Sequence, residues 1–350
     1  MSAAEPTTLN TEDNDAPTVS VVIIGRNEGE RLLRCILSVR AMAGMDGKIE
    51  LIYVDSASTD GSARLASEAG AQVFEIDSAT PTAALGRNAG WRAARAEFVL
   101  FLDGDTILHP DFLHRALAAI TVDPTIAAVW GHRREIDCDR SVYNRVLDLD
   151  WIYAPGFVKY CGGDVLMRRS ALLLVEGYDA ALIAGEEPEL CRRLRSQGYQ
   201  ILHMDAPMTG HDLAMYRMSQ YLKRALRAGH AYAEVSRRFR DTPDPFWAAE
   251  RRRNLLRGGF WSLTLITAVL CSFLVRSVLP VGAWTGFLLL LSARTAWLAR
   301  WKSQSVGTLL LYGIHSHLQQ VPIMIGQLRY ARDASSGTKR QLIDYKGQKG

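Results

Sequence analysis

The residues best suited to chemistry are two carboxylates that directly follow an apolar run. Residues 98–102 read Phe-Val-Leu-Phe-Leu, and Asp103, Gly104 and Asp105 come next. Two carboxylates one residue apart suit a Mg²⁺ or Mn²⁺ ion that also binds phosphate oxygens. The same three residues also form an ordinary turn after a strand. The choice between a metal site and a turn therefore depends on the other polar residues of the chain.

Several of these polar residues suit a nucleotide. Asp55 ends a second apolar run, where it can accept hydrogen bonds from a nucleobase or ribose, or cap the following turn. Asn27 and Glu28 follow a third run and have the same two interpretations. Arg87 offers a fork of donors to a phosphate, and Asn88 offers a paired donor and acceptor. The alternative for these two residues is a solvated helix face.

A pair of acids, Glu186 and Glu187, precedes Pro188 at the start of a predicted helix. Acids and proline are ordinary in a first helical turn. The functional interpretation is that one acid removes the proton of an attacking hydroxyl, since neighbouring carboxylates repel each other and become more basic. His211 is either structural or completes a metal site with Asp105.

Alternating strands and helices must position these residues. The pattern predicts an α/β fold with a doubly wound, mainly parallel sheet, and open sheets of this kind bind ligands at the carboxyl ends of their strands. A less regular middle part contains a possible strand at 127–131, an extended stretch at 160–167 and a helix from 186 to about 197. The predicted strands of the first part are 19–24, 50–55, 72–76 and 98–103, and its helices are 30–40, 62–69 and 83–95.

Five motifs in sequential order resemble glycosyltransferase family 2, the inverting nucleotide-sugar enzymes of GT-A fold. The resemblance spans residues 19–212, and its motifs lie at 20–28, 53–62, 86–90, 101–105 and, as a broken run, between 162 and 187. It implies that Asp55 contacts the base and that Asp103 and Asp105 serve the metal and the diphosphate. We assign direct coordination to Asp105 and a substrate-side or water-mediated role to Asp103.

The resemblance also assigns the acceptor side of the site. It implies that Gly163 and Asp164 lie there, and that Glu187 stands where the family carries a catalytic Asp, with Glu186 as the second candidate. Processive polysaccharide synthases of the family carry Gln-x-x-Arg-Trp. This chain has Gln220-x-x-Lys223-Arg224 without a tryptophan, which argues against a processive synthase.

The remaining residues point to a membrane. Residues 213–254 are basic and aromatic, which suits a helix in the headgroup layer or one packed on the catalytic domain. Within 255–300, two apolar runs near spanning length are separated by Arg276 and flanked by basic residues. This pattern predicts a transmembrane hairpin with the catalytic domain (18–212) in the cytoplasm. The alternative is a buried soluble hairpin. Residues 301–350 are predicted as an interfacial helix and a basic cytoplasmic tail.

Composition sets further bounds. The net charge of +4 is modest, and the basic residues gather in the later helices, which argues against nucleic acid and for membrane lipids. Residues 1–17 are polar and acidic, and we expect a disordered leader. The 5 cysteines are scattered, as expected for reduced thiols in the cytoplasm.

Together these patterns predict a metal-dependent, inverting glycosyltransferase of the inner membrane, active in glycan, polysaccharide or glycolipid synthesis. Its cofactor is Mg²⁺ or Mn²⁺, its donor a nucleotide sugar, and its acceptor a lipid-linked sugar or glycolipid. Two alternatives are a nucleotidyltransferase and a non-catalytic membrane scaffold with a degenerate transferase domain. The sequence leaves the sugar, the linkage and the oligomeric state open.

Overall fold

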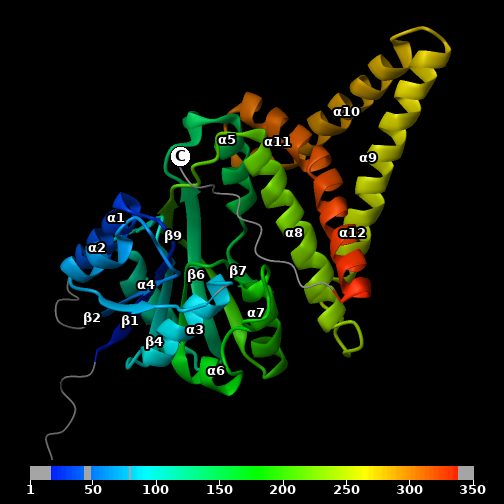
Figure 1. Ribbon diagram of the computed structural model, residues 1–350. Coiled ribbons are helices and arrows are strands. Elements are labelled where there is room, and N and C mark those ends of the chain that lie inside the picture. Colours follow the sequence, from blue (N-terminus) through cyan, green and yellow to red (C-terminus); the bar gives the residue numbers. More distant parts are fainter. Residues whose placement is uncertain (1–16, 43–48, 79, 338–350) are drawn as a thin grey trace, which may run out of the picture.

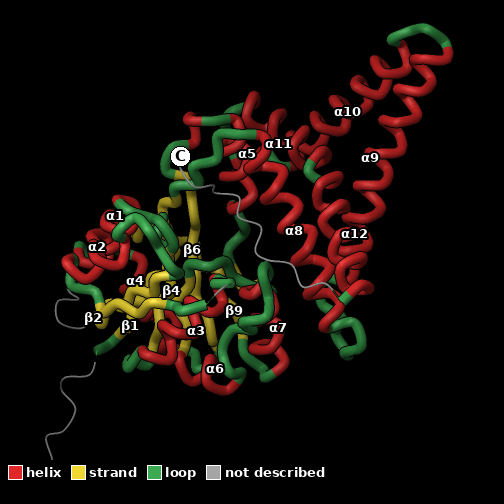
Figure 2. The backbone as a smooth tube through the Cα atoms, in the orientation of Figure 1, coloured by secondary structure: helices red, strands yellow, loops and turns green. Residues whose placement is uncertain are grey.

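The computed structural model describes residues 17–42, 49–78 and 80–337. The described residues form a mixed sheet covered by helices, followed by a separate group of helices (Figure 1). Figure 2 shows the same division, with the strands confined to the first part. Apart from Pro17, the predicted leader lies outside the described residues, as does the basic tail beyond residue 337.

The first four strands are parallel neighbours in the order β3-β2-β1-β4. The apolar runs of β1 and β4 are buried on both faces of the sheet, which is why they show no polar alternation, whereas the edge strand β3 is short and partly exposed. The chain order reverses between β1 and β4, so the carboxyl ends of these two strands border a crevice. The elements are β1 Val19–Gly25, α1 Glu30–Arg40, β2 Ile49–Asp55, α2 Ser62–Glu68, β3 Gln72–Glu75, α3 Ala83–Ala93 and β4 Phe98–Asp103.

The sheet continues beyond β4 with strands of both directions. β8 lies antiparallel between β4 and β6, and β9 is parallel to β6. The short strands β5 and β7 are antiparallel to β9. Most strands therefore run in one direction, which confirms the predicted α/β fold. The elements are β5 Thr106–Leu108, α4 Phe112–Val122, β6 Ile126–Glu135, α5 Val142–Asp148, β7 Gly156–Val158, β8 Val165–Arg168, α6 Arg169–Leu174, α7 Glu186–Ser196 and β9 Gln200–His211.

Strand register brings distant polar residues together. Ile24 pairs with Asp103, so the turn after β1 lies beside the end of β4. β9 places His211 opposite Thr106 and Glu135. Because Thr106 directly follows Asp105, this register makes Asp105 and His211 neighbours. The predicted strand at 127–131 is too short, since the polar residues after it still pair with β9.

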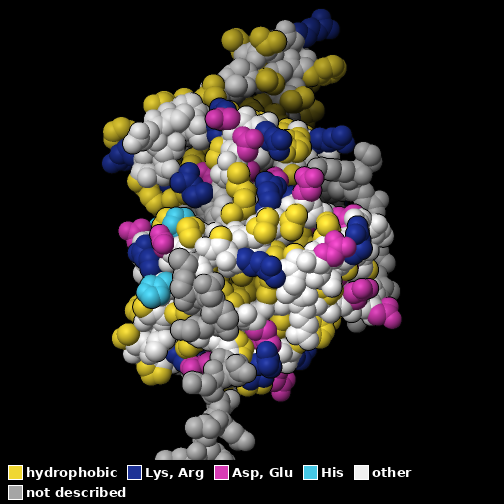
Figure 3. Space-filling view, turned by 90° about the vertical axis from the view of Figure 1, so that its left-hand side faces the viewer, with side chains coloured by type: hydrophobic (Ala, Val, Ile, Leu, Met, Phe, Trp, Pro, Cys, Tyr) yellow, Lys and Arg dark blue, Asp and Glu magenta, His cyan; other side chains and the backbone are white. Residues whose placement is uncertain are grey.

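The helical part begins with α8 and contains two long apolar helices, α9 and α10. These two helices have 27 and 20 residues and are long and apolar enough to cross a membrane. They project together from the rest of the molecule (Figure 1), and mainly hydrophobic and uncharged side chains cover the protruding part (Figure 3). Only 17% of each apolar window is buried, as expected for a lipid-facing pair rather than for core helices. The helices are α8 Met218–Arg238, α9 Ala248–Leu274 and α10 Leu279–Leu298.

Two further helices hold the hairpin to the catalytic part. α11 (Val306–Leu318) packs on α10 and α5, and α12 (Gln320–Ser336) packs on α8 and α9. The sequence predicts one interfacial segment here, whereas the structure divides it at Gln319. Pro322 lies in the first turn of α12, where its missing N–H is harmless, but it cannot continue α11.

Candidate active site

A cleft of about 2690 Å³ opens at the carboxyl ends of β1 and β4 and extends to α8. Many residues that the sequence predicts for the site line it, although they come from separate elements. The structure also keeps some predicted residues out of the lining, among them Asp55, Asn88, Asp105 and His211. The predicted residues on the cleft surface are Asn27, Glu28, Arg87, Asp103, Gly104, Asp164, Glu186 and Glu187.

Arg87 on α3 joins the two sides of this cleft. Its side chain is buried, and its nitrogens lie 2.9 Å from Asp103, 3.2 Å from Glu186 and 3.0 Å from Glu187. A solvated helix face is therefore excluded for Arg87. Its partners in the structure are carboxylates, and the phosphate contact that the sequence predicts stays a prediction. One guanidinium thus fixes the end of β4 relative to the start of α7.

Glu187 has the properties of a general base. Burial and, to a smaller extent, the neighbouring Glu186 raise the pKa of its carboxyl to about 7, against the lowering effect of Arg87. The expected repulsion between the two acids therefore contributes, but burial contributes more. The Glu187 side chain is 16% exposed and that of Glu186 is 7% exposed, so Glu187 has the better access to a substrate. A base that titrates near neutral pH is well suited to accept a hydroxyl proton.

The buried Asp164 side chain holds the carboxyl end of β4 in place through hydrogen bonds. Its carboxylate accepts a hydrogen bond from the Asp103 backbone N–H at 3.0 Å and one from the Thr209 hydroxyl at 2.7 Å. Burial raises the pKa of this carboxyl to about 6, against the lowering effect of Arg133. The residue therefore holds Asp103 in place, and an acceptor contact stays a prediction.

Gly163 lies where a side chain would displace the ion pair between Arg87 and Asp103. A Cβ atom there would clash with the Arg87 guanidinium and would lie 3.1 Å from Asp103 Oδ2. We expect Gly163→Ala to destabilise the fold by about 1–3 kcal/mol through overpacking and to lower kcat/KM. Urea unfolding and steady-state kinetics measure both effects. Gly162→Ala is the matched control, because its Cβ atom would meet no described heavy atom within 4 Å; equal effects in the two variants would contradict the prediction.

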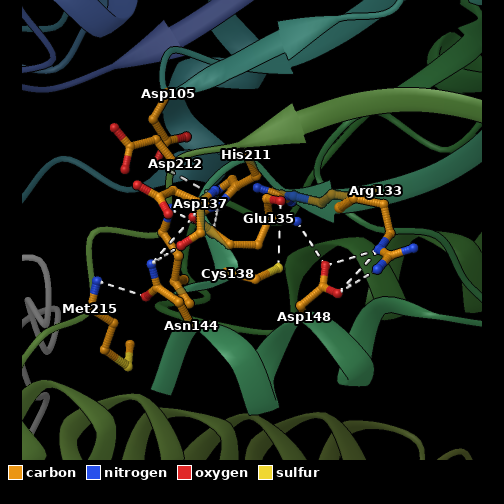
Figure 4. Close-up of polar contacts among 12 residues, drawn as sticks. Asp105, Arg133, Glu135, Asp137, Cys138, Asn144, Asp148, His211, Asp212 and Met215 are labelled. Atoms are coloured by element: carbon orange, nitrogen blue, oxygen red, sulfur yellow. Dashed lines mark hydrogen bonds and ion pairs between the residues drawn. The ribbon is translucent and has the colours of Figure 1, made fainter. Parts of the chain in front are cut away.

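Asp105 and His211 form a second, enclosed part of the site (Figure 4). Asp105 Oδ2 lies 3.3 Å from His211 Nε2, and the other ring nitrogen lies 4.0 Å from Glu135. Glu135 also accepts hydrogen bonds from the Leu213 and Asp137 backbone N–H groups. Burial raises the pKa of the Glu135 carboxyl to about 7, and these two hydrogen bonds oppose the shift. The two carboxylates of the Asp-Gly-Asp motif therefore have different partners.

The described residues contain no group of three or more His, Cys, Asp and Glu side chains placed to hold a metal ion. Asp103 instead directs its carboxylate at Arg87 and Arg133. Any ion bound at Asp105 and His211 would therefore complete its coordination with oxygens from outside the protein.

Three predicted nucleotide contacts have structural partners. Asp55 accepts hydrogen bonds from the Tyr53 hydroxyl and the Ser58 backbone N–H, and so caps the turn after β2. Asn27, in the left-handed conformation with φ 55°, accepts one from Thr59 N–H. The third residue is Asn88, whose amide binds the Tyr178 backbone and accepts from the Trp91 indole. Contacts of these residues with a nucleotide stay predictions.

Comparison with known proteins decides what kind of fold surrounds this cleft. The sequence model of the family described as glycosyl transferase family 2 matches residues 20–179. Residues 20–179 therefore resemble a glycosyltransferase family 2 domain. This match favours sugar transfer over the nucleotidyltransferase and scaffold alternatives.

Curated relatives support this assignment. An N-acetylglucosaminyltransferase of Rhizobium leguminosarum is 26% identical over 255 residues, which cover 64% of this chain and 59% of that protein. Another from Mesorhizobium japonicum is 30% identical over 191 residues, covering 49% and 44%. The chain thus spans about half the length of these relatives.

A solved structure extends the likeness beyond the residues that the family model matches. The mannosyltransferase PcManGT from Pyrobaculum calidifontis, in complex with GDP-Man and Mn²⁺, matches with a TM-score of 0.63 at 19% identity. The match covers 94% of this chain and 91% of that chain, so it includes most of the helical part. At this identity it shows the fold, with mostly parallel strands of GT-A type.

The candidate site also contains a residue that the sequence did not predict. Arg133 on β6 lies 3.4 Å from Asp103 and 3.7 Å from Asp164. Its guanidinium carbon lies 5.0 Å from the centre of the Trp151 ring. A usable signal was the run of polar residues at 132–135, directly after an apolar run, because it has the same form as the ends of β2 and β4.

Proposed function

We propose that this protein is a metal-dependent, inverting glycosyltransferase that transfers a sugar from a nucleotide-sugar donor to a lipid-linked or glycolipid acceptor. The observation that carries the proposal is the cleft, where Arg87 holds Asp103 and Glu187 to either side of one guanidinium. This arrangement supports a donor site and a base within one reaction centre. The names of the relatives support a hexose or N-acetylhexosamine donor.

The proposed reaction needs one base. Glu187 accepts the proton of the acceptor hydroxyl as its oxygen attacks the anomeric carbon, from the face opposite the departing nucleotide. Asn27 and Glu28 on the turn after β1 face the donor from the other side of the cleft. Gly104 lets the turn after β4 pack closely against the end of β1, because a Cβ atom there would lie 3.2 Å from both Glu28 Cγ and the Ile24 carbonyl.

Asp105 and His211 fit a divalent metal. A carboxylate oxygen and an imidazole nitrogen suit Mn²⁺, and their separation of 3.3 Å allows both to bind one ion. Glu135 lies on the far side of the imidazole, where a carboxylate can fix the ring orientation. The ion would neutralise the diphosphate of the leaving nucleotide. The Mn²⁺ bound to PcManGT supports this assignment.

The apolar hairpin supports a membrane location. α9 and α10 satisfy the length and composition of spanning helices. Basic residues lie in the first two turns of α9 at Arg251–Arg253, before its apolar run, and follow α10 at Arg300 and Lys302, which favours the cytoplasmic side for both flanks. In the proposed arrangement the catalytic cleft lies at the membrane surface, within reach of an acceptor that is anchored in lipid.

Replacing Asp105 with alanine tests the proposed metal. In the full chain purified in detergent, we expect Asp105→Ala to lose Mn²⁺-dependent binding of UDP- and GDP-sugars in a thermal-shift screen, with turnover lowered by about 10²-fold or more. Asp139→Ala is the control, because that side chain is 90% exposed. Sugar transfer that is undiminished in excess chelator would exclude the metal. Release of diphosphate from a nucleoside triphosphate would contradict the glycosyl-transfer proposal itself.

A further inference from the structure

One face of α8 supplies cations to the far wall of the cleft. Lys223, Arg224 and Arg227 all line the cleft, together with Gln220 one turn earlier. Residues three and four apart lie on one side of a helix, so these side chains form a single row. The sequence shows that this stretch is basic, but only the structure shows that the row faces the catalytic cleft and not bulk solvent.

The two walls of the cleft differ in charge. Around the strand ends and the start of α7 the lining carries both charges, with acids such as Asp103 and Glu187 beside Arg87 and Arg133. α8, all of whose residues the structure describes, contributes no acidic residue to the lining. Glu250 on α9 is the acidic lining residue of the helical part. The α8 row therefore offers a positive region at some distance from the base.

A continuous line of contacts joins the α8 row to the reaction centre. Asp103 contacts Arg133, and the Arg133 guanidinium lies over the Trp151 ring. The Arg224 guanidinium carbon lies 5.8 Å from the centre of the same ring. A ligand that reaches from Asp103 to Arg224 therefore crosses Trp151, which also lines the cleft.

Packing fixes α8 relative to both the base and the hairpin. Gly185, directly before Glu186, contacts α8 so closely that a Cβ atom would lie 3.1 Å from Ala231 Cβ. On its other side α8 packs against α12, where a Cβ atom at Gly229 would clash with the Ile323 backbone. α12 packs in turn on α9 of the hairpin. α8 thus lies between α7, which carries the proposed base, and the helices α12 and α9 (Figure 1).

We infer that Lys223, Arg224 and Arg227 bind the phosphate or diphosphate of an anionic, lipid-linked acceptor. This inference rests on the proposed function and selects one acceptor class from it. A lipid phosphate places its charge between an apolar tail and a polar head, which is the order of the hairpin, the α8 row and the reaction centre. Guanidinium groups match phosphate oxygens in pairs, and an ammonium group adds a point charge.

The test uses farnesyl phosphate as the probe, with the full chain in detergent and no donor present. The triple variant Lys223→Gln, Arg224→Gln, Arg227→Gln is expected to bind farnesyl phosphate at least about tenfold more weakly, since hydrogen bonds between charged groups are stronger than those between neutral groups. The control variant Arg237→Gln, Arg251→Gln, Arg252→Gln removes the same charge outside the cleft lining. Its affinity for farnesyl phosphate is expected to stay unchanged. Unchanged affinity of the triple variant for nucleotide sugar shows that it is folded.

Three outcomes would overturn the inference. One is equal affinity of the wild-type chain for farnesyl phosphate and neutral farnesol. Another is a triple variant that binds farnesyl phosphate as well as the wild type. The third is an equal loss of binding to phosphatidylglycerol vesicles, which would identify the row as a general headgroup surface. Transfer to a neutral glycolipid alone would contradict the inference but keep the proposed function, whereas phosphate binding without any sugar transfer would do the reverse.

Discussion

Replacing Glu187 with glutamine is expected to lower kcat by a factor of about 10²–10⁴, the usual contribution of a general base. Glutamine keeps the size of the side chain but cannot accept the proton of the acceptor hydroxyl. Binding of the nucleotide sugar should persist. Steady-state kinetics, together with thermal-shift titration of the donor, separate these two effects. Unchanged turnover would move the base elsewhere, and Glu186→Gln is the matched comparison, because Glu186 is the more buried neighbour.

The pH dependence gives a second measure of the same residue. Because the Glu187 pKa is raised to about 7, the carboxylate protonates as the pH falls through 7 and stops acting as a base. The wild-type kcat/KM should therefore fall tenfold per pH unit well below this value, and rise to a plateau above it. Glu187→Gln should lack this acidic limb. The same limb in both proteins would assign the titration to another group.

Replacing Arg87 with methionine is expected to lower the free energy of unfolding by about 3–5 kcal/mol, the cost of removing one partner from a buried ion pair. Three carboxylates, those of Asp103, Glu186 and Glu187, would lose their shared cation. Urea unfolding of the detergent-solubilised chain measures the change. The control is Arg64→Met, whose ion pair with Glu68 is exposed and should contribute less than about 1 kcal/mol.

The destabilisation by Arg87→Met should also depend on pH. Arg87 lowers the pKa of Glu187, so its removal raises that pKa further above the unfolded value. A carboxyl group with a raised pKa costs stability as the pH rises from the unfolded pKa towards the folded one. The difference between wild type and variant should therefore be larger at pH 8 than at pH 5. A difference that is constant over this range would contradict the charge argument and leave only packing as the cause.

The first part of the fold could be predicted from the sequence because its signals are local. The unbroken apolar runs before Asp55 and Asp103 predict strands buried on both faces, and the structure contains β2 and β4 there. The pair of apolar helices could also be predicted, since Arg276 separates two apolar runs and the structure forms α9 and α10 there. The second half of the sheet could not be predicted in the same way, because β5 and β7 have 3 residues each and depend on their pairing with β9.

The candidate site shows the same division between what local sequence signals predict and what tertiary contacts decide. By itself the sequence determined which side chains are chemically able to act, from the Asp-Gly-Asp motif to the acids before Pro188, because residue type and spacing are local properties. Only the tertiary structure decided their partners. It paired Arg87 with three carboxylates, placed His211 beside Asp105, and directed the α8 row into the cleft. These contacts join residues far apart in the chain, so strand register and helix packing fix them, and no local pattern contains that information.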